Sequence, residues 1–185
     1  MKFVFVFIFL FTSLMSQTSI YESEDVIIYN LDSQSKTIVF WGGLDYATPL
    51  WLTKQIPQKI YKKYNIVLLS YKTELGFAKK IFLEKVGYEL KPNIILGFSR
   101  GGLQAQKNYS KKYEIVGYID PVLNLIQNNK TYENVIIVFN PVVWGRKYSK
   151  TLMSYGKIIA RRGGTWEVMN IQHSKFPKYF LKKFI

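Results

Sequence analysis

Short apolar runs recur along the chain and alternate with stretches that carry apolar residues at helical spacing. The runs cover residues 36–41, 65–71, 93–98, 115–119 and 135–139. Continuous apolar runs of this length are typical of strands that are buried on both faces of a sheet. The pattern therefore predicts a series of buried strands.

The stretches between the runs predict the helices that cover these strands. Residues 49–64 place apolar side chains at helical spacing, as at Ile56, Ile60 and Tyr64, and residues 73–90 do the same. Strands that alternate with helices imply right-handed crossovers and parallel strand pairing. We therefore predict an α/β three-layer sandwich, in which a mostly parallel sheet carries helices on both faces.

Chain length and the outer segments complete this prediction. The 185 residues suffice for one domain with a single core, which we place at residues 20–185. An edge strand is expected at residues 25–30. A further strand or hairpin is expected at residues 156–168, with Gly163-Gly164 as its turn.

The first 19 residues have the layout of a signal peptide. Lys2 precedes the apolar run at residues 3–11, and small polar residues follow up to Ser19. This layout predicts export, so that the protein is periplasmic, secreted or on the cell surface. An uncleaved N-terminal membrane anchor and a first buried strand are the alternatives.

The segment Gly97-Phe98-Ser99-Arg100-Gly101 joins one apolar run to a stretch of good helix formers at residues 103–107. A serine on such a strand-turn-helix connection needs small residues two positions before and after it, because strand and helix approach closely there. Ser99 is therefore a candidate nucleophile. A glycine-rich turn that leads into a helix can instead hold a phosphate.

A serine nucleophile requires a base, and the chain has one histidine, His173. It follows the last strand-like segment, where a loop can bring its imidazole to the serine hydroxyl as general base. The alternative is an ordinary surface histidine.

The base in turn requires an orienting acid. Asp120 is the only aspartate between Ser99 and His173, and Pro121 ends its strand directly after it. This position favours Asp120 as the acid, against the alternative of a simple turn residue. Other candidates in the same interval are Asn140, Glu133 and Glu167.

These motifs resemble those of the α/β-hydrolases. Gly97-Phe98-Ser99-Arg100-Gly101 matches the family's Gly-x-Ser-x-Gly, and the Asp-Pro at residues 120–121 resembles the acid position of the pancreatic-lipase branch. The resemblance covers residues 36–185 and implies a small hydrolase without a lid. It also implies an oxyanion hole made by backbone N–H groups, and the matching positions are Arg100, Gly42, Gly43 and Leu44.

The resemblance implies a serine hydrolase that cleaves a carboxylic ester or thioester of a lipid or other acyl substrate through an acyl-enzyme, without a cofactor. Aromatic residues near the predicted strand ends are candidates for an apolar acyl site, although such residues are often simply core. They are Trp41, Tyr46, Trp51, Tyr71 and Trp144.

Charge and composition add an alternative function and exclude others. Lys and Arg number 26 against 12 Asp and Glu, giving a net charge of +14 that favours anionic partners. The basic, aromatic tail at residues 175–184 suits an anionic membrane surface if exposed, or packs its aromatic residues on the sheet. The alternative function is a catalytically silent fold that binds the envelope or membrane. No nucleic-acid motif is present, the absence of cysteine excludes disulfides, and one histidine with few carboxylates argues against a metal site.

Overall fold

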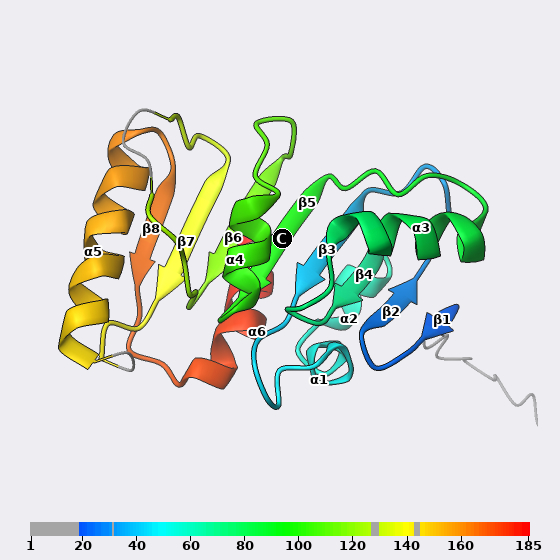
Figure 1. Cartoon of the computed structure of the whole chain (residues 1–185), viewed down its shortest axis with the longest axis horizontal. Helices are drawn as coiled ribbons and strands as arrows, with labels where there is room; N and C mark the ends of the chain where they lie inside the picture. The colour runs from blue at the N-terminus through cyan, green and yellow to red at the C-terminus, as the bar shows by residue number, and fades with distance from the viewer. Residues whose placement is uncertain (1–18, 31, 127–129, 143–144) are drawn as a thin grey trace, which may run out of the picture.

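One eight-stranded sheet organises the part of the chain that the computed structural model describes, residues 19–30, 32–126, 130–142 and 145–185 (Figure 1). Its strands are β1 (Tyr21–Glu22), β2 (Val26–Tyr29), β3 (Thr37–Trp41), β4 (Asn65–Leu69), β5 (Ile94–Phe98), β6 (Ile115–Ile119), β7 (Val135–Phe139) and β8 (Thr165–Val168). They lie in the order β1-β2-β4-β3-β5-β6-β7-β8. The pairs β1/β2 and β2/β4 are antiparallel, and all the others are parallel.

The five apolar runs form the five central strands, β3 to β7. Every residue of β3, β4 and β5 is buried, because helices cover both faces of the sheet there. β4 ends at Leu69, two residues before the predicted end of its run. The strand expected at residues 25–30 is present as β2, but β1 pairs along its outer side, so β2 is not the edge.

Within the described part of the chain, three α-helices lie on each face of the sheet. α3 (Leu75–Val86), α4 (Gly101–Lys107) and α5 (Gly145–Arg161) cover one face, and α1 (Pro49–Thr53), α2 (Gln58–Tyr61) and α6 (Phe176–Phe184) cover the other. Successive strand residues alternate between the two cores that result: Val39 packs with α3 to α5, and Phe40 packs with α1, α2 and α6. The predicted three-layer α/β sandwich is confirmed.

Two predicted elements differ from the structure. Residues 49–64 form two short helices and not one, because Pro57 has an extended backbone at the start of α2 and cannot continue the preceding helix. The strand or hairpin expected at residues 156–168 is confirmed as a strand only over β8, and its first half is wrong. Gly156 lies inside α5, where the absence of a side chain lets the helix approach the ring of Trp166 on β8, and Gly163-Gly164 forms the turn between them.

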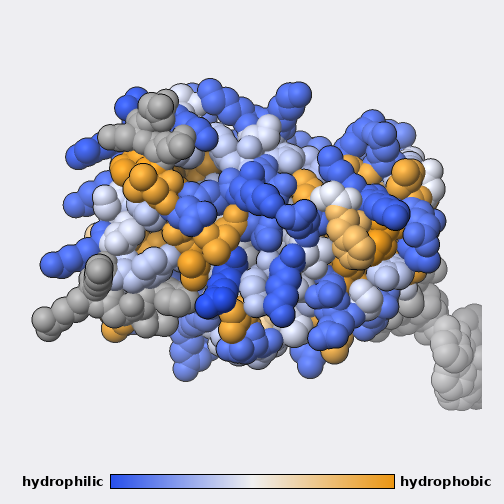
Figure 2. All heavy atoms as spheres, viewed as in Figure 1, coloured by the Kyte–Doolittle hydropathy of each residue, from blue (hydrophilic) through white to orange (hydrophobic). Residues whose placement is uncertain are grey.

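The basic tail forms α6 and packs on the sheet. Phe176, Phe180 and Leu181 are buried, whereas the tail's lysines are exposed. This confirms the interpretation that the tail's aromatic residues belong to the core. Hydrophilic residues dominate the face that carries α4, with smaller hydrophobic patches between them (Figure 2).

The predicted signal peptide falls on residues 1–18, which lie outside the described residues, and on Ser19. Among the helices that are described, none has the length and apolar character needed to cross a bilayer.

Two phenylalanines on helices provide a test of the packing of α6. Phe180→Ala removes a fully buried ring and should lower the free energy of unfolding by about 3–5 kcal/mol. Phe77 on α3 is 54% exposed, so Phe77→Ala should change the free energy of unfolding by less than about 1 kcal/mol. Urea unfolding of both variants measures the difference. Equal losses would contradict the placement of α6 as a core helix.

Candidate active site

The carboxyl ends of the parallel strands bring the candidate residues to one edge of the sheet. Ser99 directly follows β5, Asp120 directly follows β6, and Gly42 directly follows β3. His173 opens a short 3-10 helix, η1 (His173–Lys175), five residues after the end of β8. Ligands of open α/β sheets bind at this edge, so the topology itself assembles a site there.

Ser99 sits in a strained turn between β5 and α4. Its φ of 52° lies in the left-handed region, which a serine adopts at a cost of about 1–3 kcal/mol. The turn is fixed by hydrogen bonds from Ser99 N–H to Ile119 O (3.0 Å) and from Val122 N–H to Ser99 O (2.8 Å). A Cβ at Gly97 would overlap the Gly101 carbonyl, so the flanking glycines are required by this close approach. The turn has the features of a nucleophile elbow.

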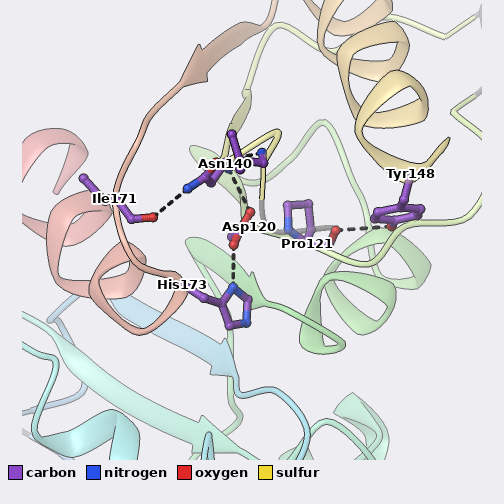
Figure 3. Close-up of polar contacts among 7 residues, drawn as sticks. Asp120, Pro121, Asn140, Tyr148, Ile171 and His173 are labelled. Carbon is purple, nitrogen blue, oxygen red and sulfur yellow. Dashed lines mark hydrogen bonds and ion pairs between the residues drawn. The ribbon is translucent and has the colours of Figure 1, made fainter. Parts of the chain in front are cut away.

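Asp120 and His173 are in direct contact. Asp120 is fully buried; its Oδ2 pairs with Nδ1 of His173, and its Oδ1 accepts a hydrogen bond of 3.0 Å from the backbone N–H of Asn140 (Figure 3). The backbone of Asp120 is also left-handed, with φ 39°. The imidazole further packs on the ring of Phe98, at a centroid distance of 4.4 Å. Carboxylate and ring together therefore hold His173 in one orientation.

Ser99 and His173 line the same cleft, which has a volume of about 360 Å³. The other residues that line it are Leu44, Asp45, Tyr46, Ala47, Arg100 and Val122. Partial burial, and then the negative charges of Asp120 and Asp45, raise the pKa of Tyr46. The Tyr46 hydroxyl therefore remains protonated, as a hydrogen-bond donor, at neutral pH.

The four candidate oxyanion donors differ in the state of their N–H groups. Gly42 donates to Leu69 O (2.8 Å) and Gly43 donates to Ala47 O (3.0 Å), so both groups are already engaged. Within the described residues, the N–H groups of Leu44 and Arg100 make no hydrogen bond. Since both residues also line the cleft, the geometry favours Leu44 and Arg100 over the two glycines.

The aromatic candidates differ in where they lie relative to the cleft. Tyr46 lines the cleft, and Trp51 lies behind it, at 5.3 Å from Tyr46 and stacked on Phe98 at 5.5 Å between ring centroids. Tyr71 lines a neighbouring hollow of about 210 Å³ that shares Leu44 and Asp45 with the cleft.

Trp41 does not line the cleft, contrary to the prediction. It is fully buried in the core beneath α3 to α5, and its indole Nε1 donates to Thr73 O (2.8 Å). Its position at the end of β3 is as expected, but its side chain points into a packed layer. The remaining candidate, Trp144, lies outside the described residues.

The alternative acids are engaged elsewhere. Glu167 pairs with Lys183 and accepts a hydrogen bond of 2.8 Å from Tyr179, both on α6, and Glu133 lies against Gly163 in the turn before β8. The side chain of Asn140 donates to Ile171 O at 2.9 Å (Figure 3). No group of three or more His, Cys, Asp or Glu that could hold a metal ion occurs among the described residues.

The sequence did not indicate how Phe98, Val122 or Asn140 supports the site. Phe98 and Asn140 carried partial signals: Phe98 occupies a variable position of the Gly-x-Ser-x-Gly motif, and Asn140-Pro141 repeats the strand-ending pattern of Asp120-Pro121. Val122 carried none, because its place on the cleft depends on its hydrogen bond to Ser99.

Comparison with known proteins identifies the fold. No protein-family model and no curated protein matches the sequence. Solved structures do match, with a TM-score of 0.58 for a predicted CIB-like hydrolase from Thermoplasma acidophilum, at 18% identity over 85% of this chain and 88% of that one. The esterase domain of a Rhodothermus marinus protein matches with a TM-score of 0.56 at 12% identity, over 85% and 88% of the two chains. A Thermogutta terrifontis esterase matches with a TM-score of 0.51 at 14% identity, over 78% and 75%.

The chain has the α/β-hydrolase fold. Because the identities are low, this likeness concerns the fold, and the chemistry has to be argued from the site. The resemblance of the acid position to the pancreatic-lipase branch stays a prediction.

Gly43 offers a test of the packing around Ser99. A Cβ added at Gly43 would lie 2.8 Å from the Ser99 Cβ and 3.3 Å from its Oγ. Gly43→Ala should therefore displace the serine and slow its labelling by a fluorophosphonate by about 10²-fold, because small misplacements of reacting groups are costly. Gly76→Ala on α3 meets no neighbouring atom and serves as the control. Unchanged labelling in Gly43→Ala would contradict the close contact.

Proposed function

We propose that this protein is a serine hydrolase that cleaves carboxylic esters or thioesters of lipid or other acyl substrates. The observation that carries the proposal is the buried Asp120–His173 pair, whose imidazole shares a cleft with a serine in a strained turn. A carboxylate on Nδ1 selects the tautomer in which Nε2 accepts a proton. The esterase names of the structural neighbours agree with this function.

The reaction has two half-reactions. In the first, His173 Nε2 accepts the proton of Ser99 Oγ as the oxygen attacks the acyl carbonyl carbon, and the tetrahedral oxyanion accepts hydrogen bonds from the N–H groups of Leu44 and Arg100. The carbon–oxygen or carbon–sulfur bond then breaks, and His173 gives its proton to the leaving alcohol or thiol. In the second, His173 deprotonates a water that attacks the acyl-enzyme, and Ser99 is regenerated with release of the acid.

The lining of the cleft favours an apolar acyl group. Leu44, Ala47 and Val122 present aliphatic surface beside Ser99, and Tyr46 adds an aromatic ring with a hydroxyl donor. A cleft of about 360 Å³ is at the small end of ligand sites, which suits a short or partly inserted acyl chain. Arg100, which is exposed, adds a positive charge to the lining of the cleft.

The first test addresses the nucleophile. Ser99→Ala should fold normally, lose all fluorophosphonate labelling, and lower kcat on a short-chain p-nitrophenyl ester by about 10⁴-fold or more. Intact-mass analysis and peptide mapping of the labelled wild-type protein locate the adduct.

Two results would overturn this assignment. Labelling of another residue would remove Ser99 as the nucleophile. A folded wild-type protein without labelling or turnover would favour the catalytically silent module, for which the net charge of +14 predicts binding to anionic vesicles.

The second test addresses the orienting acid. Asp120→Asn keeps the volume of the buried side chain but lets the carboxamide donate to His173 Nδ1, which selects the wrong tautomer. We expect kcat to fall by about 10²- to 10⁴-fold, with less effect on KM. Glu133→Gln is a matched control with the same loss of one negative charge and should change kcat less than about twofold. Equal effects of the two substitutions would contradict the role of Asp120.

A further inference from the structure

Asn140 makes three hydrogen bonds at the end of β7. Its backbone N–H donates to Asp120 Oδ1 (3.0 Å) and its Nδ2 donates to Ile171 O (2.9 Å) (Figure 3). Its Oδ1 accepts from Val142 N–H (2.8 Å). Asn140 is 4% exposed and its bond to Asp120 is buried, so loss of that bond would be costly, whereas the other two bonds are partly buried.

The bond to Ile171 O reaches the segment that carries His173. β8 ends at Val168, and a last ladder bond from Met169 N–H to Phe139 O (3.0 Å) closes its pairing with β7. The chain then leaves the sheet and reaches His173 at the start of η1. Asn140 fixes this departing segment two residues before the histidine.

One residue therefore contacts both sides of the Asp120–His173 pair. Its main chain holds the carboxylate, and its side chain holds the backbone that presents the imidazole. We infer that Asn140 is a positioning residue that fixes His173 against Asp120. This inference rests on the proposed function for its kinetic consequence, but the geometric claim can be tested without any activity.

The carboxamide is suited to this position because it donates and accepts at once. An aspartate could accept from Val142 N–H, but its second oxygen would face the Ile171 carbonyl oxygen and add a charge next to Asp120. An alanine would leave both backbone groups without their partner. Asn140→Asp should therefore misplace His173 as Asn140→Ala does. If position 140 instead served to orient His173 as an acid, the carboxylate of Asn140→Asp would raise activity.

Kinetics provide the first measurement. In Asn140→Ala and Asn140→Asp, kcat on a short-chain ester should fall by about 10- to 100-fold with KM within about twofold, as expected for a misplaced catalytic group. Asn134→Ala is the matched control: Asn134 precedes the opposite end of β7, and its Nδ2 donates to Ser110 O (3.0 Å) and Tyr113 O (2.8 Å). It should lower thermal stability but leave kcat within about twofold.

The single histidine of the chain allows a second measurement that is independent of turnover. Nitrogen-15 NMR of the imidazole reports the tautomer of His173 without assignment ambiguity. We expect a protected Nδ1–H tautomer in the wild type and in Asn134→Ala. In both Asn140 variants we expect a tautomer mixture and faster exchange of the imidazole proton.

The outcomes separate the two proposals. A wild-type tautomer in both folded Asn140 variants would overturn the positioning role, and so would unfolding of the isosteric Asn140→Asp, because the role would then be structural. A mixture of tautomers in these variants supports the positioning role. If the wild-type protein also proves unreactive toward fluorophosphonates, that second result contradicts the proposed function but not the positioning role.

Discussion

The arrangement of the site depends on a carboxylate that is wholly removed from water. A buried charge is stable only when donors surround it, and Asp120 receives the N–H of Asn140 and the imidazole of His173. These donors come from the ends of β7 and from beyond β8. The full set of donors to Asp120 is therefore in place only when both β7 and β8 have joined the sheet.

Close packing at the strand ends is the second constraint on the site. Ser99 and Asp120 both have left-handed backbones directly after their strands, which turns the two side chains out of the sheet at its carboxyl edge. The strain is held by hydrogen bonds between the two turns, from Ser99 N–H to Ile119 O and from Val122 N–H to Ser99 O. The turn with the serine and the turn with the acid are thus one hydrogen-bonded unit.

Much of this could be predicted from the sequence, and the reasons differ between elements. Continuous apolar runs identify β3 to β7 because strands covered on both faces have no polar side, and Pro121 identifies the end of β6 because proline cannot continue the ladder. Because such strands are apolar on both faces, their sequence does not indicate toward which face each side chain points. Trp41 therefore looks as suitable for the cleft as Tyr46, until the structure shows it beneath α3.

Other features depend on contacts between distant segments and leave no local signal. Gly156 permits the approach of α5 to Trp166, which a hairpin prediction from local composition cannot anticipate. Its place at the end of a strand makes Asn140 a candidate substitute acid in the sequence, and only the path of residues 169–172 brings Ile171 O to its carboxamide. A polar residue at a buried strand end can therefore have either of two roles. It can contact the reacting groups, or it can hold the segment that carries them. The partners of its side chain distinguish the two roles. For Asn140 they are backbone groups: the Ile171 carbonyl in the segment that carries the histidine, and the Val142 N–H in its own turn.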